Sequence, residues 1–247
     1  MKKLISLAVL LLFAAGCKMK TAFYTDDQAI PLGEGLSDSL ILSVSIEYPV
    51  KGMGEEALSA ITSEILNTAF DMEDVNPASV EETAVRYADN LKDEYFNEYG
   101  ERPRGEGGIH SWEDRVNGYF SGKYKDYDSY MVEYYNARGG AADLYTMTPV
   151  VFERKTGRVV PEKEFFAEGY RDPVGELIRK HIPEALDNDE SILSDLNDPE
   201  YILPNGTYEV TESGVTWYYQ PLEIAPSYVG VIIVPVPWEE LKPYLRQ

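Results

Sequence analysis

The sequence contains very little cysteine and histidine, and this scarcity excludes several kinds of site. Its single cysteine, Cys17, cannot form a disulfide within the chain or build a zinc or iron–sulfur site made only of cysteines. The two histidines, His110 and His181, are too few for a histidine-rich metal centre. We therefore expect no metal ion and no cofactor.

Basic residues are also scarce, because 22 Lys and Arg stand against 43 Asp and Glu and give a formal charge of −21 at pH 7. Nucleic acid is excluded as a partner, since its binding requires a basic surface. Residues 21–85 contain 13 acids and one base, and the segment between Lys180 and Lys242 contains 12 acids and no base. A field of one sign attracts cationic partners, although the commoner meaning of an acidic surface is solubility.

Catalytic sequence motifs are missing as well. There is no GxSxG nucleophile elbow, no phosphate-binding P-loop, no HExxH and no GxGxxG. The acidic stretch 187–198 has oxygen ligands at alternate positions, but Ile192 and Asp198 stand where an EF-hand calcium loop needs Gly and Glu. We interpret this stretch as a helix-capping loop. The sequence predicts no catalytic residue and no metal ligand.

The first 17 residues are typical of a bacterial lipoprotein. Two lysines precede an uncharged apolar run, which is long enough for a signal peptide but too short to span a bilayer. The run ends in Ala-Ala-Gly-Cys, which resembles a lipobox. We predict a signal peptide over 1–16, a lipid on Cys17 that anchors the chain to a membrane, a tether over 17–38, and an extracytoplasmic location, either periplasmic or at the cell surface. In the alternative, ordinary signal cleavage, Cys17 has no special role.

Hydrophobic periodicity predicts an α+β fold, with helices in the first half and antiparallel strands in the second. A strand is expected over 40–48, and helices over 55–70 and 77–99. Residues 112–160 are rich in Tyr, Val and Thr and predict an antiparallel meander of three or four strands. Further elements are expected as helices at 161–166, 172–181 and 238–245, a hairpin at 208–219 and a strand at 229–236.

Tyrosine is abundant, and seven of the 19 tyrosines fall between Tyr119 and Tyr145. Exposed aromatic side chains with polar tips suit sugar stacking or a protein interface, whereas buried ones on strands are ordinary sheet formers. Neighbouring residues of a strand face opposite ways, so two consecutive tyrosines cannot both be core residues of a sheet with one buried side. The aromatic candidates for binding are Tyr134, Tyr135, Trp217, Tyr219 and Tyr228.

Two segments resemble a known family. Residues 137–166 contain a Gly-Gly-Ala turn, a strand, a Thr-Gly turn and a helix, and residues 214–245 read GVTWYYQPLEIAPSYVGVIIVPVPWEELKPYL. Both are similar to the RsiV-like family of extracytoplasmic domains, in which a smaller PdaC-type region often precedes the C-terminal domain. The resemblance implies an α+β fold with a PdaC-type N-terminal α/β region over 39–110 and an RsiV-like domain over 111–247.

The resemblance also implies a binding role, because the name-giving member of the family binds lysozyme. Its anti-sigma role needs a membrane span and a cytoplasmic region that this sequence does not show. The histidine that follows the family's glycine turn is replaced by Ala142, which argues against an activity that needs an imidazole. Gly139, Gly140 and Glu223 match the family pattern. Glu223 is the one charge in an apolar motif, so it is either a hydrogen-bond anchor or a binding residue.

These patterns favour a lipid-anchored, non-enzymatic domain that binds an extracytoplasmic ligand, either a cationic protein such as lysozyme or a cell-wall glycan. The alternative is a hydrolase that acts on peptidoglycan or another glycan through paired carboxylates, with Glu223 or acids of 187–200 as candidates. The same sequence features also fit a third possibility, a purely structural envelope lipoprotein.

Overall fold

The computed structural model of the protein describes residues 19–31, 39–99, 111–138 and 143–246. Within these ranges the chain forms two β-sheets and several helices, which confirms the predicted α+β class. Several predictions lie outside the described residues, namely the signal peptide, the lipid on Cys17, and the positions of His110, Gly139 and Gly140.

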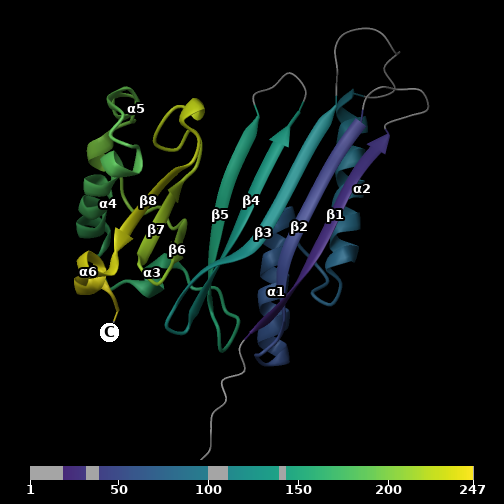
Figure 1. Cartoon of the computed structure of the whole chain (residues 1–247), viewed down its shortest axis with the longest axis horizontal. Helices are drawn as coiled ribbons and strands as arrows, with labels where there is room; N and C mark the ends of the chain where they lie inside the picture. The colour runs from purple at the N-terminus through teal and green to yellow at the C-terminus, as the bar shows by residue number, and fades with distance from the viewer. Residues whose placement is uncertain (1–18, 32–38, 100–110, 139–142, 247) are drawn as a thin grey trace, which may run out of the picture.

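The larger sheet has five strands in the order β1-β2-β3-β4-β5 (Figure 1). Neighbouring strands are antiparallel, except that β2 and β3 are parallel. The last three strands follow one another both in sequence and in the sheet, which confirms the predicted meander. The strands are β1 (Lys20–Pro31), β2 (Ser39–Lys51), β3 (Trp112–Tyr124), β4 (Tyr127–Ala137) and β5 (Leu144–Glu153).

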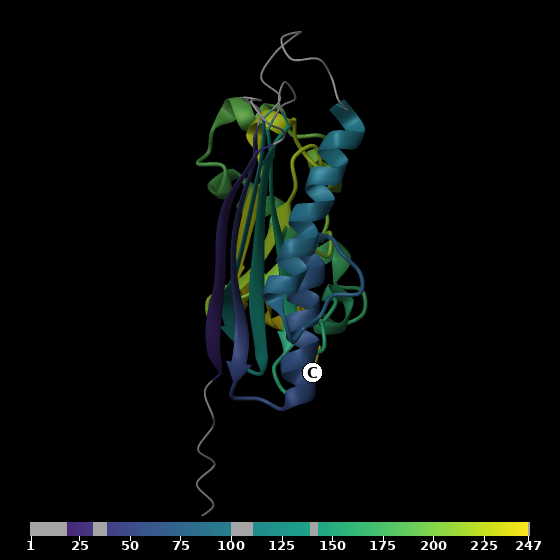
Figure 2. The same ribbon diagram turned by 90° about the vertical axis from the view of Figure 1, so that its right-hand side faces the viewer.

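Two helices connect β2 to β3 and cover one face of this sheet (Figure 2). They are α1 (Glu55–Phe70), which agrees with the prediction, and α2 (Val80–Tyr99). Alternate residues of β2 from Leu40 to Ile46 face these helices and are at most 3% exposed, so they form the floor of the first hydrophobic core. Within the described part of the chain, no helix combines the length and the apolar character needed to cross a bilayer.

Helix α2 begins later than predicted. Asn76 forms a turn, in which its side-chain oxygen accepts a hydrogen bond from the backbone N–H of Ala78 at 3.0 Å. Ser79 takes the capping role, because its Oγ accepts a hydrogen bond from the backbone N–H of Glu82 at 3.2 Å. Asn76 still supports the first turn of the helix, since its Nδ2 donates to the Glu82 carboxylate at 2.7 Å.

The polar segment predicted as a tether contains a strand, so that prediction was wrong for residues 20–31. These residues form β1, which pairs antiparallel with β2 along its whole length. Tyr24 packs against the first core, whereas Phe23 points away from it and is 63% exposed. The hydrophobic alternation of the strand is weak in the sequence, because Phe23 faces outward while the polar residues Asp26 and Gln28 lie on the partly buried face.

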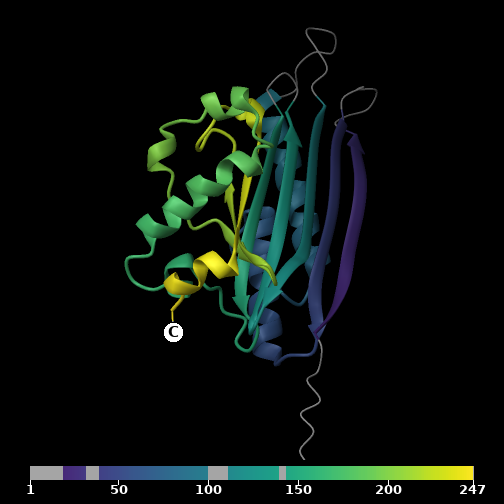
Figure 3. The same ribbon diagram turned by 60° about the vertical axis from the view of Figure 1, so that its left-hand side comes forward.

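The smaller sheet has three antiparallel strands in the order β6-β7-β8 and packs against α4 (Figure 3). Its hairpin confirms the prediction for residues 208–219, and every residue of β7 is buried. The remaining elements are β6 (Tyr208–Val210), β7 (Gly214–Tyr219), β8 (Ile232–Pro237), α3 (Glu162–Phe165), α4 (Arg171–Ala185), α5 (Glu190–Ser194), α6 (Trp238–Leu241), η1 (Pro199–Tyr201), η2 (Ser227–Val229) and η3 (Lys242–Tyr244).

Hydrogen bonds between β4 and β6 join the two sheets. The fully buried Ser129 donates from Oγ to the Val210 carbonyl and accepts from the Val210 N–H, both at 2.9 Å. Adjacent residues of β5 belong to different cores, Phe152 to the first and Val151 to the second. The domain boundary predicted between residues 110 and 111 therefore falls inside the larger sheet, while the change of core falls at β5.

We expect Ser129→Ala to lower the free energy of unfolding by about 2 kcal/mol, because Val210 would keep a buried N–H and C=O without their partner. Chemical denaturation followed by circular dichroism measures this change. Ser59→Ala, at an exposed position of α1, is the matched control and should change stability by less than about 0.5 kcal/mol. Equal losses for the two variants would contradict the joining role of Ser129.

Candidate functional site

Two of the aromatic candidates are core residues. Trp217 and Tyr219 lie on β7 and are 0% and 1% exposed. Phe166 stacks on Trp217 with the ring centres 5.9 Å apart, and the Tyr219 hydroxyl donates to the Leu203 carbonyl at 2.9 Å. Both side chains therefore stabilise the second core and cannot contact a ligand without unfolding it.

Glu223 is exposed, and its carboxylate anchors a turn. Its Oε1 accepts a hydrogen bond from Asn205 Nδ2 and its Oε2 accepts one from the Gln220 backbone N–H, both at 2.8 Å. Of the two roles left open for Glu223, these contacts favour the hydrogen-bond anchor. Tyr228 is 69% exposed on η2, where its hydroxyl is hydrogen-bonded to the Asp195 carboxylate.

Tyr134 and Tyr135 point to opposite faces of the larger sheet, as strand alternation predicts. Tyr135 lies on the face away from the helices, where its hydroxyl donates to Asp143 at 2.8 Å and the Arg115 guanidinium lies 5.0 Å from its ring centre. Tyr134 faces the helices and packs against the first core. Its hydroxyl donates to Asp114 at 2.7 Å, so Tyr134 belongs to the polar cluster from which the candidate site is built.

Asp114 of β3 is a carboxylate in the core beneath the helices, with 0% exposure. Its Oδ2 accepts hydrogen bonds from the hydroxyl of Tyr87 on α2 at 3.0 Å, from the hydroxyl of Tyr134 at 2.7 Å and from Arg138 Nη2 at 3.1 Å. A buried carboxylate costs several kcal/mol unless charges and hydrogen bonds compensate for its lost hydration. These three donors supply that compensation and fix α2 and the end of β4 around one oxygen atom.

Arg138, which directly follows β4, completes the cluster. Its guanidinium carbon lies 4.0 Å from the ring centre of Trp112, a cation–π contact, and its Nη1 lies 3.9 Å from a carboxylate oxygen of Glu94. Among the described residues, Arg138 Nη1 has no hydrogen-bond acceptor and Asp114 Oδ1 has no donor, although both atoms are buried. Buried polar atoms without a hydrogen-bond partner require a physical explanation, and one such explanation is that these atoms take part in binding.

Burial and the carboxylate of Asp114 set the protonation states of the cluster. Burial raises the pKa of Tyr87, and the nearby Asp114 raises it further. Burial and the hydrogen bond to Asp114 also raise the pKa of Tyr134. Burial alone would lower the pKa of Arg138, but Asp114 and Tyr134 outweigh this effect, so its pKa is raised. At neutral pH both tyrosines are therefore hydrogen-bond donors and Arg138 is a cation.

A pocket of about 430 Å³ opens beside the cluster. It lies between the C-terminal end of α1, the middle of α2 and the helix-facing side of β4 and β5. Phe70 and Leu91 contribute apolar surface to its wall, whereas Asn90, Thr146 and Arg138 contribute polar groups. The wall is therefore a mixture of polar and apolar surface, and a concave site with placed polar groups can hold a small molecule. We refer to this cavity as the helix–sheet pocket.

The acidic stretch 187–198 has a structural role, in agreement with the interpretation as a capping loop. The Asp189 carboxylate accepts hydrogen bonds from the backbone N–H groups of Ser191 and Ile192 and so caps α5. The Ser191 hydroxyl, together with these backbone groups, lowers the pKa of Asp189. Across the ranges that the structure describes, no group of three or more His, Cys, Asp or Glu side chains is placed to hold a metal ion.

Sequence reasoning missed Asp114, Tyr87 and Arg138. Asp114 is one of 43 acids, and its neighbours match no catalytic or binding motif. A signal does exist in the strand alternation, because Asp114 occupies the same side of β3 as Trp112 and Val116, which are both 1% exposed. An acid at a core position of a strand was therefore the detectable anomaly.

A model of the family described as "Protein of unknown function (DUF3298)" matches residues 163–239, which extend from α3 into α6. No curated protein sequence matches the chain. A crystal structure of a DUF3298 family member from Bacteroides fragilis is similar, with a TM-score of 0.79, 18% identity and coverage of 94% of this chain and 95% of that chain. A DUF3298 family protein from Pseudomonas aeruginosa has a TM-score of 0.67 and 13% identity, with coverage of 92% and 94%. At these identities the likeness shows the fold alone.

We expect Asp114→Asn to lower the free energy of unfolding by about 3 kcal/mol, because Arg138 would lose its counter-charge inside the core. An amide oxygen can still accept a hydrogen bond but cannot balance the guanidinium charge. Urea denaturation measures the change, and Asp93→Asn, at an exposed position of α2, is the matched control with a change below about 0.5 kcal/mol. Indistinguishable midpoints for the two variants would contradict the role given to Asp114.

Proposed function

We propose that this protein is a non-enzymatic binding protein of the cell envelope and that its helix–sheet pocket takes a small hydroxyl-rich ligand, such as a saccharide unit of a cell-wall glycan. The observation that carries the proposal is the buried cluster around Asp114, which holds Tyr134 and Arg138 rigidly at the wall of an open pocket. Rigid placement of polar groups reduces the ordering cost of binding.

The chemistry of the pocket wall fits hydroxyl groups. The side chains of Asn90 and Thr146 line the pocket and make no hydrogen bond within the described part of the chain, so they are free to donate to and accept from a ligand. The partly buried side chain of Met72, which also lines the pocket, can contact the C–H face of a sugar ring. A ligand with alternating hydroxyl and C–H surface would satisfy both parts of the wall.

The charges around the pocket disfavour an anionic ligand. Arg138 is the cation of the wall, and Asp114 already neutralises it at 3.1 Å. Asp71 and Glu94 also line the pocket and add negative charge. The local field therefore favours a neutral or amino-bearing ligand over a carboxylate or a phosphate.

A hydrolytic role has less support than binding. Hydrolysis of a glycoside requires two carboxyl groups on opposite sides of the bond to be cleaved. Asp114 Oδ2 already accepts three hydrogen bonds, and both oxygens of Glu223 are engaged in its turn. We therefore propose that the protein binds a saccharide and releases it without hydrolysing it.

The cellular location belongs to the same proposal. The apolar run that ends at Cys17 supports export and lipid attachment, which would place the protein on a membrane outside the cytoplasm. Because β1 begins at Lys20, only two residues would separate the lipid-bearing Cys17 from the folded sheet. The folded part would then lie close to the membrane surface.

We expect the chitin disaccharide, used as a probe, to bind to the protein in saturation-transfer NMR and to be recovered intact. Thr146→Val removes one ligand hydrogen bond without changing the side-chain volume and should weaken binding about fivefold. Thr25→Val, at an exposed position of β1, is the matched control and should bind normally. Equal affinities for the two variants would contradict the pocket, and appearance of the monosaccharide would contradict the non-enzymatic role.

A cationic protein is the second candidate partner, because the helices that cover the larger sheet are strongly acidic. Between residues 55 and 97, ten acidic side chains are exposed and only two basic ones, Arg86 and Lys92. Among the described residues, Glu94 is the one acid of this set with an ion-pair partner, Arg138. The exposed acids, which we call the acidic helix surface, are Glu55, Glu56, Asp71, Glu73, Asp74, Glu81, Glu82, Asp89, Asp93 and Glu94.

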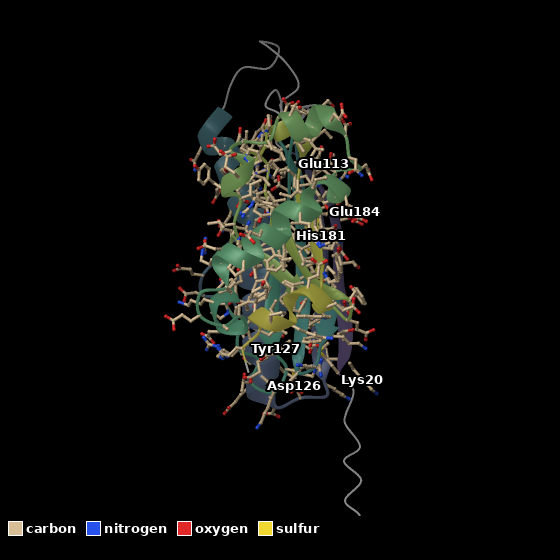
Figure 4. All side chains as sticks on the ribbon, turned by 90° about the vertical axis from the view of Figure 1, so that its left-hand side faces the viewer. Lys20, Glu113, Asp126, Tyr127, His181 and Glu184 are labelled. Atoms are coloured by element: carbon tan, nitrogen blue, oxygen red, sulfur yellow. The ribbon has the colours of Figure 1, made fainter. Side chains whose placement is uncertain are left out.

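Lysozyme, used as a cationic probe, should be retained by the immobilised protein at low salt and released at high salt, because screening weakens exposed charge pairs. Changing Glu81, Asp89 and Asp93 to their amides should lower the affinity about tenfold at low salt. The control changes Glu184, Glu190 and Glu200 to Gln, and Glu184 lies on α4, on the side that Figure 4 shows. Equal losses for both triple variants would contradict binding at the acidic helix surface.

A further inference from the structure

Strand β1 ends the larger sheet, and one of its two edges has no partner strand within the described part of the chain. The sheet order places β1 outermost, and β1 pairs only with β2. It is 12 residues long, and Figures 1 and 3 both show it at the margin of the sheet. Such an edge presents a row of backbone N–H and C=O groups that another strand can pair with.

Two features make this edge a good template for pairing. It is long, and its one proline, Pro31, is the last residue of the strand, so proline does not interrupt the edge. Near its start, as the fourth residue, it carries Phe23, a large apolar side chain that is 63% exposed on the face away from the helices. Natural edge strands are usually shortened, interrupted or charged to prevent pairing.

We infer that two copies of this chain pair antiparallel through residues 20–26 of β1, around a two-fold axis at Phe23, and form one continuous sheet. Symmetry restricts the register of such a pair. A two-fold axis perpendicular to the sheet keeps each side chain on its own face, so the residues opposite each other must both be odd-numbered or both be even-numbered. Only a few registers satisfy this condition along β1.

Charge complementarity selects one of these registers. Lys20 is the only basic residue of β1, and Asp26 and Asp27 are its acids. With the axis at Phe23, each Lys20 lies opposite the partner's Asp26, so the interface gains two cross-strand ion pairs. The two Phe23 side chains then lie directly opposite each other, where they shield one another from water.

Neighbouring registers lack this match. An axis at Tyr24 places Lys20 opposite the partner's Gln28, and an axis at Ala22 places Lys20 opposite the partner's Tyr24. An axis at Asp26 brings two Asp26 carboxylates directly opposite each other, and like charges in that position are destabilising. The axis at Phe23 is therefore the register that pairs the one cation of the strand with an acid.

The net charge of −21 per chain opposes association, so the ion pairs act against a repulsive background. At physiological salt the screening length is about 8 Å, which weakens repulsion between distant charges more than attraction between charges that lie directly opposite. Physiological salt is therefore the condition for the test.

Cysteine cross-linking tests the register. In the full chain with Cys17→Ser, in detergent, Phe23→Cys would bring two thiols together across the axis, because opposite residues have Cα atoms about 4.5–5.5 Å apart and a disulfide spans this distance. Thr25→Cys is the matched control on the same face of β1, but its two copies would lie about 13 Å apart. Under mild oxidation we expect about tenfold more disulfide dimer for Phe23→Cys than for Thr25→Cys.

A charge exchange tests the ion pairs. In the Phe23→Cys background, Lys20→Asp places like charges opposite each other and should reduce cross-linking about tenfold. Adding Asp26→Lys restores opposite charges in reversed positions and should recover the cross-link. Circular dichroism of each variant checks that the fold is intact, which is expected because Lys20 is exposed and Asp26 is only partly buried.

Three results would overturn the inference. The first is that Phe23→Cys forms no disulfide dimer, and the second is that Thr25→Cys cross-links as much as Phe23→Cys or more. The third is that Asp26→Lys does not restore the cross-linking that Lys20→Asp removes. These results are independent of the saccharide and lysozyme experiments, since no residue of β1 lines the helix–sheet pocket or belongs to the acidic helix surface.

Discussion

The parallel pairing of β2 with β3 is the constraint on which the rest of the larger sheet depends. Antiparallel neighbours can be joined by a short turn, whereas parallel neighbours require the chain to travel back along the sheet. The chain does so through α1 and α2, and the helices thereby cover one face of the sheet and bury the alternate apolar residues of β2. The other face keeps polar residues such as Arg115 and Glu133, which are partly or fully exposed.

The same crossover explains why an acid can stand in the core. Helix α2 brings the Tyr87 hydroxyl to Asp114, and the antiparallel return of β4 brings Tyr134 and Arg138 to the same oxygen. The cluster replaces the lost hydration of the carboxylate. Burial of the charge therefore costs little folding free energy while all members of the cluster are present, and much when one member is removed. A purely apolar residue at position 114 would fill the space more simply. The charge at position 114 instead fixes the side chains of Tyr87, Tyr134 and Arg138 at the wall of the helix–sheet pocket.

Much of the fold could be predicted from the sequence, because the apolar periodicities of α1, the meander and the C-terminal hairpin are strong and local. Strand β1 could not be predicted, since the apolar Phe23 faces outward and the polar residues Asp26 and Gln28 lie on its partly buried face. The start of α2 was misplaced because Asn76 is equally suited to a turn and to a cap. For the site, Tyr134 was found from strand alternation, whereas Asp114 depends on partners 20 to 27 residues away. Contacts at such separations leave no local pattern in a single sequence.

The correction of the tether changes how the protein would be held on a membrane. From a lipid on Cys17, three residues to Lys20 span at most about 10 Å, so β1 would begin at the membrane surface. In a pair related by a two-fold axis at Phe23, the two anchors lie at opposite ends of the paired strands, about 40 Å apart. Both lipids can insert into one bilayer only when the continuous sheet lies along the membrane plane. The acidic helix surface would then face away from anionic headgroups, which repel it, and the helix–sheet pocket on that side would open toward the envelope.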